Sequence, residues 1–394
     1  APGTVLGALV ALTLALPRAA RAEYAAEALD GATPAERVAK AAELEAKDVG
    51  RVLDALSALG GRKLKKGEAE PHLDFLAEYA VQQRSRVLRL AAVSVGRQLD
   101  AAGFAARVRA HADGTDRMRS SLAAECLGYA GGEEDQETLV KLANSPSISI
   151  AVRACEALAK MGGKDQADQL IEIALDHPNV EVADHATWAA LDILKKEKTL
   201  LSKMKRSVGK DTASPRGIRY AALEAMLADG AEPFKWGKPL EELWKLHAGA
   251  AGREAIPINA ADQTRREKIE AALAWLKENL PGTHHLLQMS VVSIEFPGSP
   301  PDAHLDLTKY SICVPLSYSG QNERQLAYHL ARIGTVLFEK RIGNPFEGHR
   351  GWENAIFDTF DVCELAGLYN AGKGGINRDQ FLENIIGQRP WGGN

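Results

Sequence analysis

The chain has 394 residues, of which 45% are hydrophobic and 25% charged, and its formal net charge is −4. This composition is typical of a soluble folded protein with room for two or three domains, and the mildly acidic balance argues against nucleic-acid binding, which needs a basic surface. Aromatic residues make up only 6% of the chain, which favours closely packed helices over a β-rich fold.

The first 22 residues have the pattern of a secretory signal peptide. Residues 5–16 are uncharged and almost wholly apolar, and Ala20-Arg21-Ala22 follows as an A-x-A cleavage site. The apolar run is too short to span a bilayer, and no other run is long enough. A buried N-terminal helix is the alternative reading. We expect an exported protein, periplasmic or extracellular, with no membrane span in its mature form.

Residues 23–84 predict an N-terminal helical cap for the repeats that follow. Thr33 is a good N-cap residue, and Pro34 suits the first position of the helix that it opens. Gly60-Gly61 ends the apolar pattern of that unit, and Pro71 begins a further helix that runs to about Gln83.

The middle of the chain repeats itself. The stretches 123–132, 154–163 and 187–194 are variations of one helix, with Leu127 and Leu158 separated by 31 residues and Leu158 and Leu191 by 33. An earlier copy covers residues 86–96 and a later one covers 218–227. A turn that contains proline precedes several of these helices. A period in this range indicates stacked helical hairpins, each of which buries its apolar face against its neighbours.

The segment from Val152 to Gly162 resembles the second helix of a HEAT repeat, especially the short bacterial PBS-lyase HEAT-like type. It has an Arg after a β-branched residue, an Ala-x-x-Ala-Leu core and a Gly stop. The resemblance covers about residues 85–230. It implies an α-solenoid and a role in protein–protein binding or scaffolding. Relatives include lyases and deoxyhypusine hydroxylase, but the paired His-Glu metal motifs of the hydroxylase are missing, so that activity is not implied.

The remainder predicts a helical extension over 231–284 and a C-terminal domain over 285–394. A helix covers about 263–280, and Pro281-Gly282 stops it. Residues 289–296 and 310–314 read as two strands of a short hairpin, after which helices are expected over 323–341, 352–369 and 378–386. The fold class is therefore mainly α, a solenoid followed by a small α+β or mostly helical domain.

Several side chains of this C-terminal region could carry chemistry. Asp302, His304 and Asp306 alternate and would share one side of an extended segment, which suits a divalent cation, but a fourth ligand is missing and an ordinary half-exposed strand is favoured. His349 and Arg350 could act as base and anion clamp. His284-His285 reads as a pair in a loop. We expect neither a metal nor another cofactor.

The cysteines are widely spaced, and C-x-x-C motifs are missing. Cys126 and Cys155 lie on corresponding helices of adjacent repeats, so an oxidising compartment would allow a disulfide. The favoured interpretation is that both are small buried side chains, because they occupy alanine-like positions.

The sequence favours an exported, non-enzymatic binding or scaffolding protein whose second helices line an interaction groove. The side chains expected on this groove are Arg153, Glu156, Asp184, Trp188, Arg219 and Glu224. Trp188 could anchor a partner or fill the core between repeats, and the core role is favoured. Two alternatives stay open: an enzyme with His304, Asp306 and His349 at its active site, and a subunit of a homo-oligomer.

Overall fold

A computed structural model describes residues 33–344, except for 65–66, 84, 114, 229–232, 251–252, 254, 298–304 and 307, together with residues 27 and 29–31. The predicted signal peptide and the helices expected over 352–369 and 378–386 lie outside the described residues, as do Asp302, His304, His349, Arg350 and Cys363.

Among the described residues, the helices α3 (Pro34–Glu45), α4 (Val49–Gly60) and α5 (Glu70–Gln82) precede the repeats. Thr33 and Glu36 form a capping box at the start of α3, and Asp48 accepts a hydrogen bond from the amide of Gly50 at the start of α4. These side chains satisfy amides that have no partner within the helix. The predicted N-terminus of α3 is confirmed.

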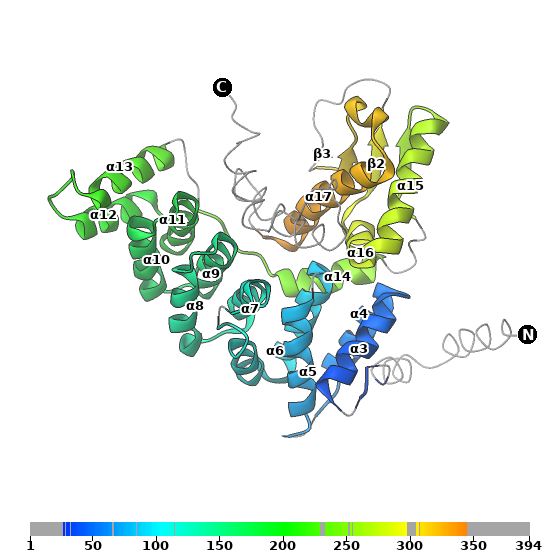
Figure 1. The fold of residues 1–394 in the computed structure, drawn as a ribbon, viewed down its shortest axis with the longest axis horizontal. Helices are drawn as coiled ribbons and strands as arrows, with labels where there is room; N and C mark the ends of the chain where they lie inside the picture. Colours follow the sequence, from blue (N-terminus) through cyan, green and yellow to red (C-terminus); the bar gives the residue numbers. More distant parts are fainter. Residues whose placement is uncertain are drawn as a thin grey trace, which may run out of the picture.

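The repeats form a row of helical hairpins (Figure 1). We call the segment from α6 to α13 the hairpin array. Its helices are α6 (Arg86–Arg109), α7 (Arg117–Ala130), α8 (Gln136–Ala143), α9 (Ile148–Met161), α10 (Lys164–Asp176), α11 (Val180–Leu194), α12 (Glu197–Val208) and α13 (Pro215–Ala228). Asp100 has non-helical backbone angles and divides α6 into two parts, which lets the chain pass from one hairpin to the next.

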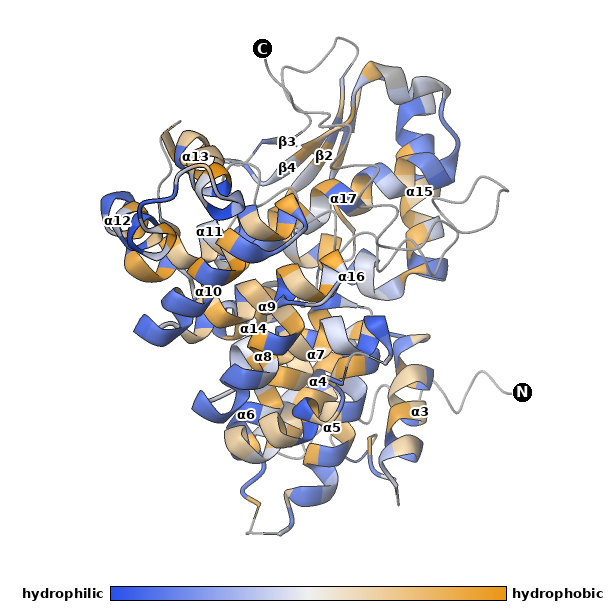
Figure 2. Cartoon of the chain, turned by 60° about the vertical axis from the view of Figure 1, so that its left-hand side comes forward, coloured by the Kyte–Doolittle hydropathy of each residue, from blue (hydrophilic) through white to orange (hydrophobic). Residues whose placement is uncertain are grey.

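Small residues set how closely the second helices approach. The helices α7, α9 and α11 pack side by side, and each also packs on its neighbouring first helix. A Cβ atom placed on Gly128 of α7 would lie 2.8 Å from the Cα of Ala157 on α9. Leu127, Leu158 and Leu191, the residues that revealed the period, are fully buried. In Figure 2 the hydrophilic residues of α8, α10 and α12 lie on the outer side of the array.

The chain then returns and builds a mixed layer of helices and a small sheet. Its elements are α14 (Pro239–Ala250), β1 (Ile258–Ala260), α15 (Gln263–Asn279), α16 (Pro281–Ser290), β2 (Ser293–Phe296), β3 (Leu305–Asp306), β4 (Ser311–Cys313) and α17 (Glu323–Ile342). The strand order is β1-β2-β4-β3, with β2 parallel to both β1 and β4, and β3 antiparallel to β4.

Several expectations for this region are wrong in detail. Pro281 follows the end of α15 but also begins α16, because proline suits the first turn of a helix. His284 and His285 therefore lie on a helix and not in a loop. Met289 and Ser290 belong to α16, which leaves β2 only four residues. The two predicted strands pair in parallel and do not form a hairpin. Strand β1 lies within residues 231–284, for which the sequence predicts a helical extension and no strand.

Two apolar cores hold the molecule. The larger one runs through α3 to α14, and it also takes in Leu286 and Met289 of α16 and Phe338 and Ile342 of α17. The smaller one lies between the sheet and α15 to α17. Because α16 and α17 contribute to both cores, the C-terminal layer is packed directly on the first repeats. Among the described residues, the helices are all too short or too polar to cross a membrane.

Candidate protein-interaction surface

The groove residues predicted from sequence all lie on second helices, but their exposure differs. Arg153 is only 4% exposed. Glu156, Asp184, Trp188 and Arg219 are half-buried, and Glu224 is exposed. The prediction that Arg153 is an exposed groove residue is therefore wrong.

Arg153 is buried because it belongs to an ionic network inside the array. The carboxylate of Glu125 on α7 accepts hydrogen bonds from Arg89 Nε at 2.8 Å and from Arg153 Nη1 at 3.1 Å. Arg86 also pairs with Glu125, and the Nε atom of Arg86 lies 2.8 Å from Glu339 Oε1 on α17. Buried charges persist only when they are paired and hydrogen-bonded. The network therefore joins three second helices to the C-terminal layer.

The C-terminal ends of α9 and α11 are partly covered by the chain itself. Residues 233–238, which we call the return segment, lead from the end of the array towards α14. The amide of Phe234 donates to Asp192 Oδ1 at 2.7 Å, and Lys195 Nζ donates to the carbonyl of Phe234 at 2.9 Å. Lys160 Nζ lies over the ring of Trp236, 5.0 Å from its centroid. The return segment thus ties the end of the array to the ends of α9 and α11.

Trp188 has the role of a half-buried packing residue in the array. Its side chain packs against the main apolar core and keeps an intermediate exposure. A tryptophan in this position buries most of its ring while one edge stays accessible. The fold thus supports the core interpretation and leaves an anchoring role as a prediction.

The end of the array carries an uncovered apolar stripe. Helix α13 buries Gly217, Leu223 and Leu227. On the opposite side its exposed residues are spaced at i, i+3, i+4 and i+7, which places them on one face; they are Ile218, Ala221, Ala222 and Ala225. Ile218 is 64% exposed. We call these four residues the α13 stripe. Sequence reasoning assigned this helix to the array but could not show that its second face is exposed in the described part of the chain.

Polar groups lie around the α13 stripe. The hydroxyl of Tyr220 donates to Glu224 Oε1 at 2.8 Å, and burial together with this carboxylate raises the pKa of Tyr220 to about 12. Nη1 of Arg219 is buried and has no hydrogen-bond partner among the described residues. Arg219 is half-buried and follows Ile218 directly in the helix, so its guanidinium adds a positive charge beside the apolar face.

Of the three residues in the alternative active site, only Asp306 lies within the described residues. Its carboxylate accepts hydrogen bonds from the amide of Thr308 at 2.9 Å and from that of Lys309 at 3.0 Å, and its pKa is lowered to about 2, chiefly by the Thr308 hydroxyl. Asp306 thus closes its own turn. Within the described ranges, His, Cys, Asp and Glu side chains do not gather into a metal-binding group.

Cys126 and Cys155 are both free and fully buried, so the disulfide alternative is wrong and the small-residue interpretation is confirmed. Burial raises the pKa of Cys126 to about 11 and that of Cys155 further. Neither thiol is therefore ionised at neutral pH, and a role as a nucleophile is not supported.

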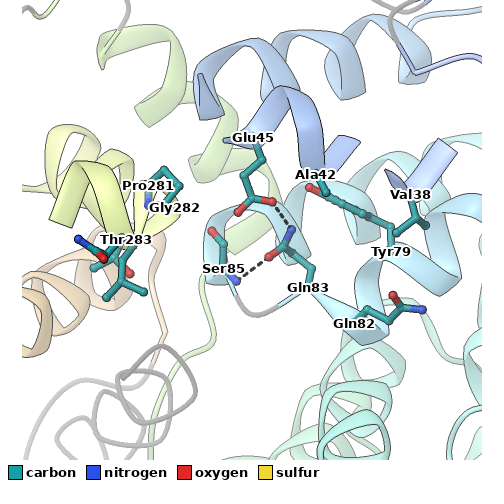
Figure 3. A pocket seen from close by; sticks show the side chains of 12 residues that line it. Val38, Ala42, Glu45, Tyr79, Gln82, Gln83, Ser85, Pro281, Gly282 and Thr283 are labelled. Atoms are coloured by element: carbon teal, nitrogen blue, oxygen red, sulfur yellow. Dashed lines mark hydrogen bonds between the residues drawn. The ribbon is translucent and has the colours of Figure 1, made fainter. Parts of the chain in front are cut away.

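A cleft lined by both apolar and polar residues lies between the N-terminal helices and the corner of α15 and α16 (Figure 3). Glu45, Tyr79, Gln83 and Ser85 line one side, and the residues from Asn279 to Thr283 line the other. Gln83 Nε2 donates to Glu45 Oε2 at 2.9 Å, and Gln83 Oε1 accepts from the amide of Ser85 at 2.8 Å. Sequence reasoning missed this cleft because its sides are far apart in the chain.

Comparison with protein families supports the repeat assignment. A family model described as HEAT repeats matches residues 105–191. This segment is similar to known HEAT repeats. It extends from the second part of α6 to the end of α11, within the predicted range of 85–230, and α12 and α13 continue the hairpins beyond it. Searches of curated proteins and of solved structures return no match.

Proposed function

We propose that this chain is an exported, non-enzymatic scaffold that holds a partner protein through the end of its hairpin array. HEAT repeats point to protein interaction, and the observation that carries this proposal is the α13 stripe. A helix that is apolar on both sides is normally buried on both sides. Ile218 nevertheless has 64% of its surface exposed, so α13 has one covered face and one that suits a partner.

The occupant that fits the α13 stripe is an amphipathic helix of another protein. Two of the earlier second helices are each covered by the next one along the row: α9 covers α7, and α11 covers α9. A partner helix would extend this packing, with the small side chains of Ala221, Ala222 and Ala225 allowing close approach. An acidic residue beside its apolar face would meet Arg219. Glu156, Asp184 and Trp188 remain proposed secondary contacts along the inner side.

The most direct test places a photo-reactive benzoyl-phenylalanine at position 218 of the full chain in its native host. The control carries the same group at Val180, another exposed apolar residue, at 55% exposure. We expect one discrete cross-linked protein from position 218 and none from 180. Equal labelling from both sites, or no discrete product from 218, would contradict the proposal. A product that contains two copies of this chain would replace the heterologous partner with a homo-oligomer.

Export is the part of the proposal that depends on residues 1–22 alone. The apolar run of residues 5–16 and the cleavage pattern that ends at Ala22 support it. N-terminal sequencing of the protein isolated from its host should give Glu23 as the first residue. Retention of residues 5–16 in the cytosolic fraction would refute export without affecting the interaction surface.

A further inference from the structure

The cleft between α3, α5 and the corner of α15 and α16 has the size of a ligand site. Its volume is about 470 Å³, within the range of small-molecule pockets and far larger than the space of a single water. Figure 3 shows Glu45 and Gln83 facing the start of α16 across this space, with Ser85 close to Gly282. Such clefts between packed layers are common places for small ligands.

The start of α16 leaves hydrogen-bond donors without partners. Leu280, at the N-cap position, offers no side-chain acceptor. The first backbone hydrogen bond of the helix runs from the amide of His284 to the carbonyl of Leu280, at 3.0 Å. The amides of Gly282 and Thr283 belong to buried residues and have no acceptor among the described groups. Buried amides are seldom left unpaired, and these two also lie at the positive end of a helix dipole.

Two buried hydroxyls accompany these amides. The Ser85 Oγ and the Tyr79 OH have no hydrogen-bond partner in the described structure, and the two residues are 8% and 3% exposed. Ser85 packs directly on Gly282, where an added Cβ would collide with its hydroxyl. The amides and the hydroxyl of Ser85 can therefore converge on one acceptor group of a ligand.

The other end of the cleft has the opposite polarity. Glu45 contributes a carboxylate that accepts a hydrogen bond from Gln83, and burial raises the pKa of Glu45. The described lining residues include no lysine, arginine or histidine. A phosphate would meet the Glu45 carboxylate without a compensating cation, and a simple cation would meet the positive end of α16, so neither suits the whole cleft.

We propose that this cleft binds a free α-amino acid or a similar small zwitterion. Its carboxylate accepts from the amides of Gly282 and Thr283 and from Ser85, and its ammonium group pairs with Glu45. A ligand held in this way contacts both the N-terminal helices and α16, so its binding stabilises the junction between them. This site is independent of the α13 stripe.

Titration calorimetry on the full mature chain tests this assignment, with each of the twenty amino acids as the probe. We expect one or a few to bind. The N-acetyl derivative and the methyl ester of the same amino acid should each bind at least about tenfold more weakly, because each removes one charge. If no amino acid binds at about 10 mM, or if both derivatives bind as well as the parent, the proposal is wrong.

Variants place the binding within the cleft. Glu45→Gln should weaken the amino acid by about tenfold, and Ser85→Ala should weaken it to a smaller degree without changing the shape of the cleft. Glu224→Gln, on the exposed face of α13, is the control and should bind as the parent does. Circular dichroism confirms that each variant is folded. Unchanged affinity in both cleft variants would overturn the assignment.

Discussion

At the scale of single residues, the most consequential side chain is Glu125. It is almost fully buried and pairs with Arg86, Arg89 and Arg153, which come from two different helices. The sequence placed Glu125 in the repeat motif but gave no sign of this role, because its partners come from other hairpins. A buried carboxylate with several guanidinium partners holds their positions, and its loss leaves their charges without compensation.

We therefore predict that Glu125→Gln lowers the free energy of unfolding by about 3–5 kcal/mol. The matched control is Glu137→Gln on α8, which changes an exposed glutamate and should cost less than about 0.5 kcal/mol. Urea unfolding followed by circular dichroism measures both. Similar losses in the two variants would show that the network does not hold the array together.

At the scale of elements, the sequence predicted what depends on local pattern. The period of the buried leucines gave the hairpins, and the predicted helix over 323–341 matches α17 (Glu323–Ile342) because its apolar spacing and its Asn322 cap are both local. Strand β1 could not be predicted, because three residues acquire strand structure only by pairing with β2, which lies far along the chain. The cleft and the α13 stripe likewise depend on which elements meet.

The contact between α7 and α9 leads to a prediction with opposite signs at two glycines. Gly128→Ala should destabilise the protein by about 1–3 kcal/mol, because the new methyl group meets the backbone of Ala157. Gly249→Ala on α14 adds a methyl group in open space and should be neutral or stabilise by up to about 1 kcal/mol. Thermal unfolding of the two variants distinguishes them, and equal effects would contradict the close helix packing.

At the scale of the whole molecule, the N-terminal helices and the C-terminal layer meet at a group of histidines. His247 on α14 lies 5.7 Å from His285 on α16, measured between ring centroids, and His247 Nε2 lies 3.0 Å from Asp54 Oδ1 on α4. Burial lowers the pKa of His284 and of His285 to about 4. The positive charge of Lys277 lowers the pKa of His284 further, whereas the negative charge of Asp48 partly offsets the lowering at His285.

The lowered pKa values of these two histidines predict that the folded protein loses stability in acid. The folded chain binds fewer protons than the unfolded chain between pH 6.5 and about 4, so the free energy of unfolding falls as the pH drops through this range. We expect a loss of at least about 1 kcal/mol from this pair. Replacing both by glutamine should flatten the pH profile there. An unchanged profile in the double variant would mean that other groups control acid stability.

The central claim is that the chain binds a partner protein through the α13 stripe. The most direct measurement is the dissociation constant between the full mature chain and the protein that cross-links to position 218. For Ile218→Asp we predict a dissociation constant at least about tenfold higher than that of the parent, and for Val180→Asp one within about twofold of it. Equal affinities for Ile218→Asp and the parent would contradict the claim.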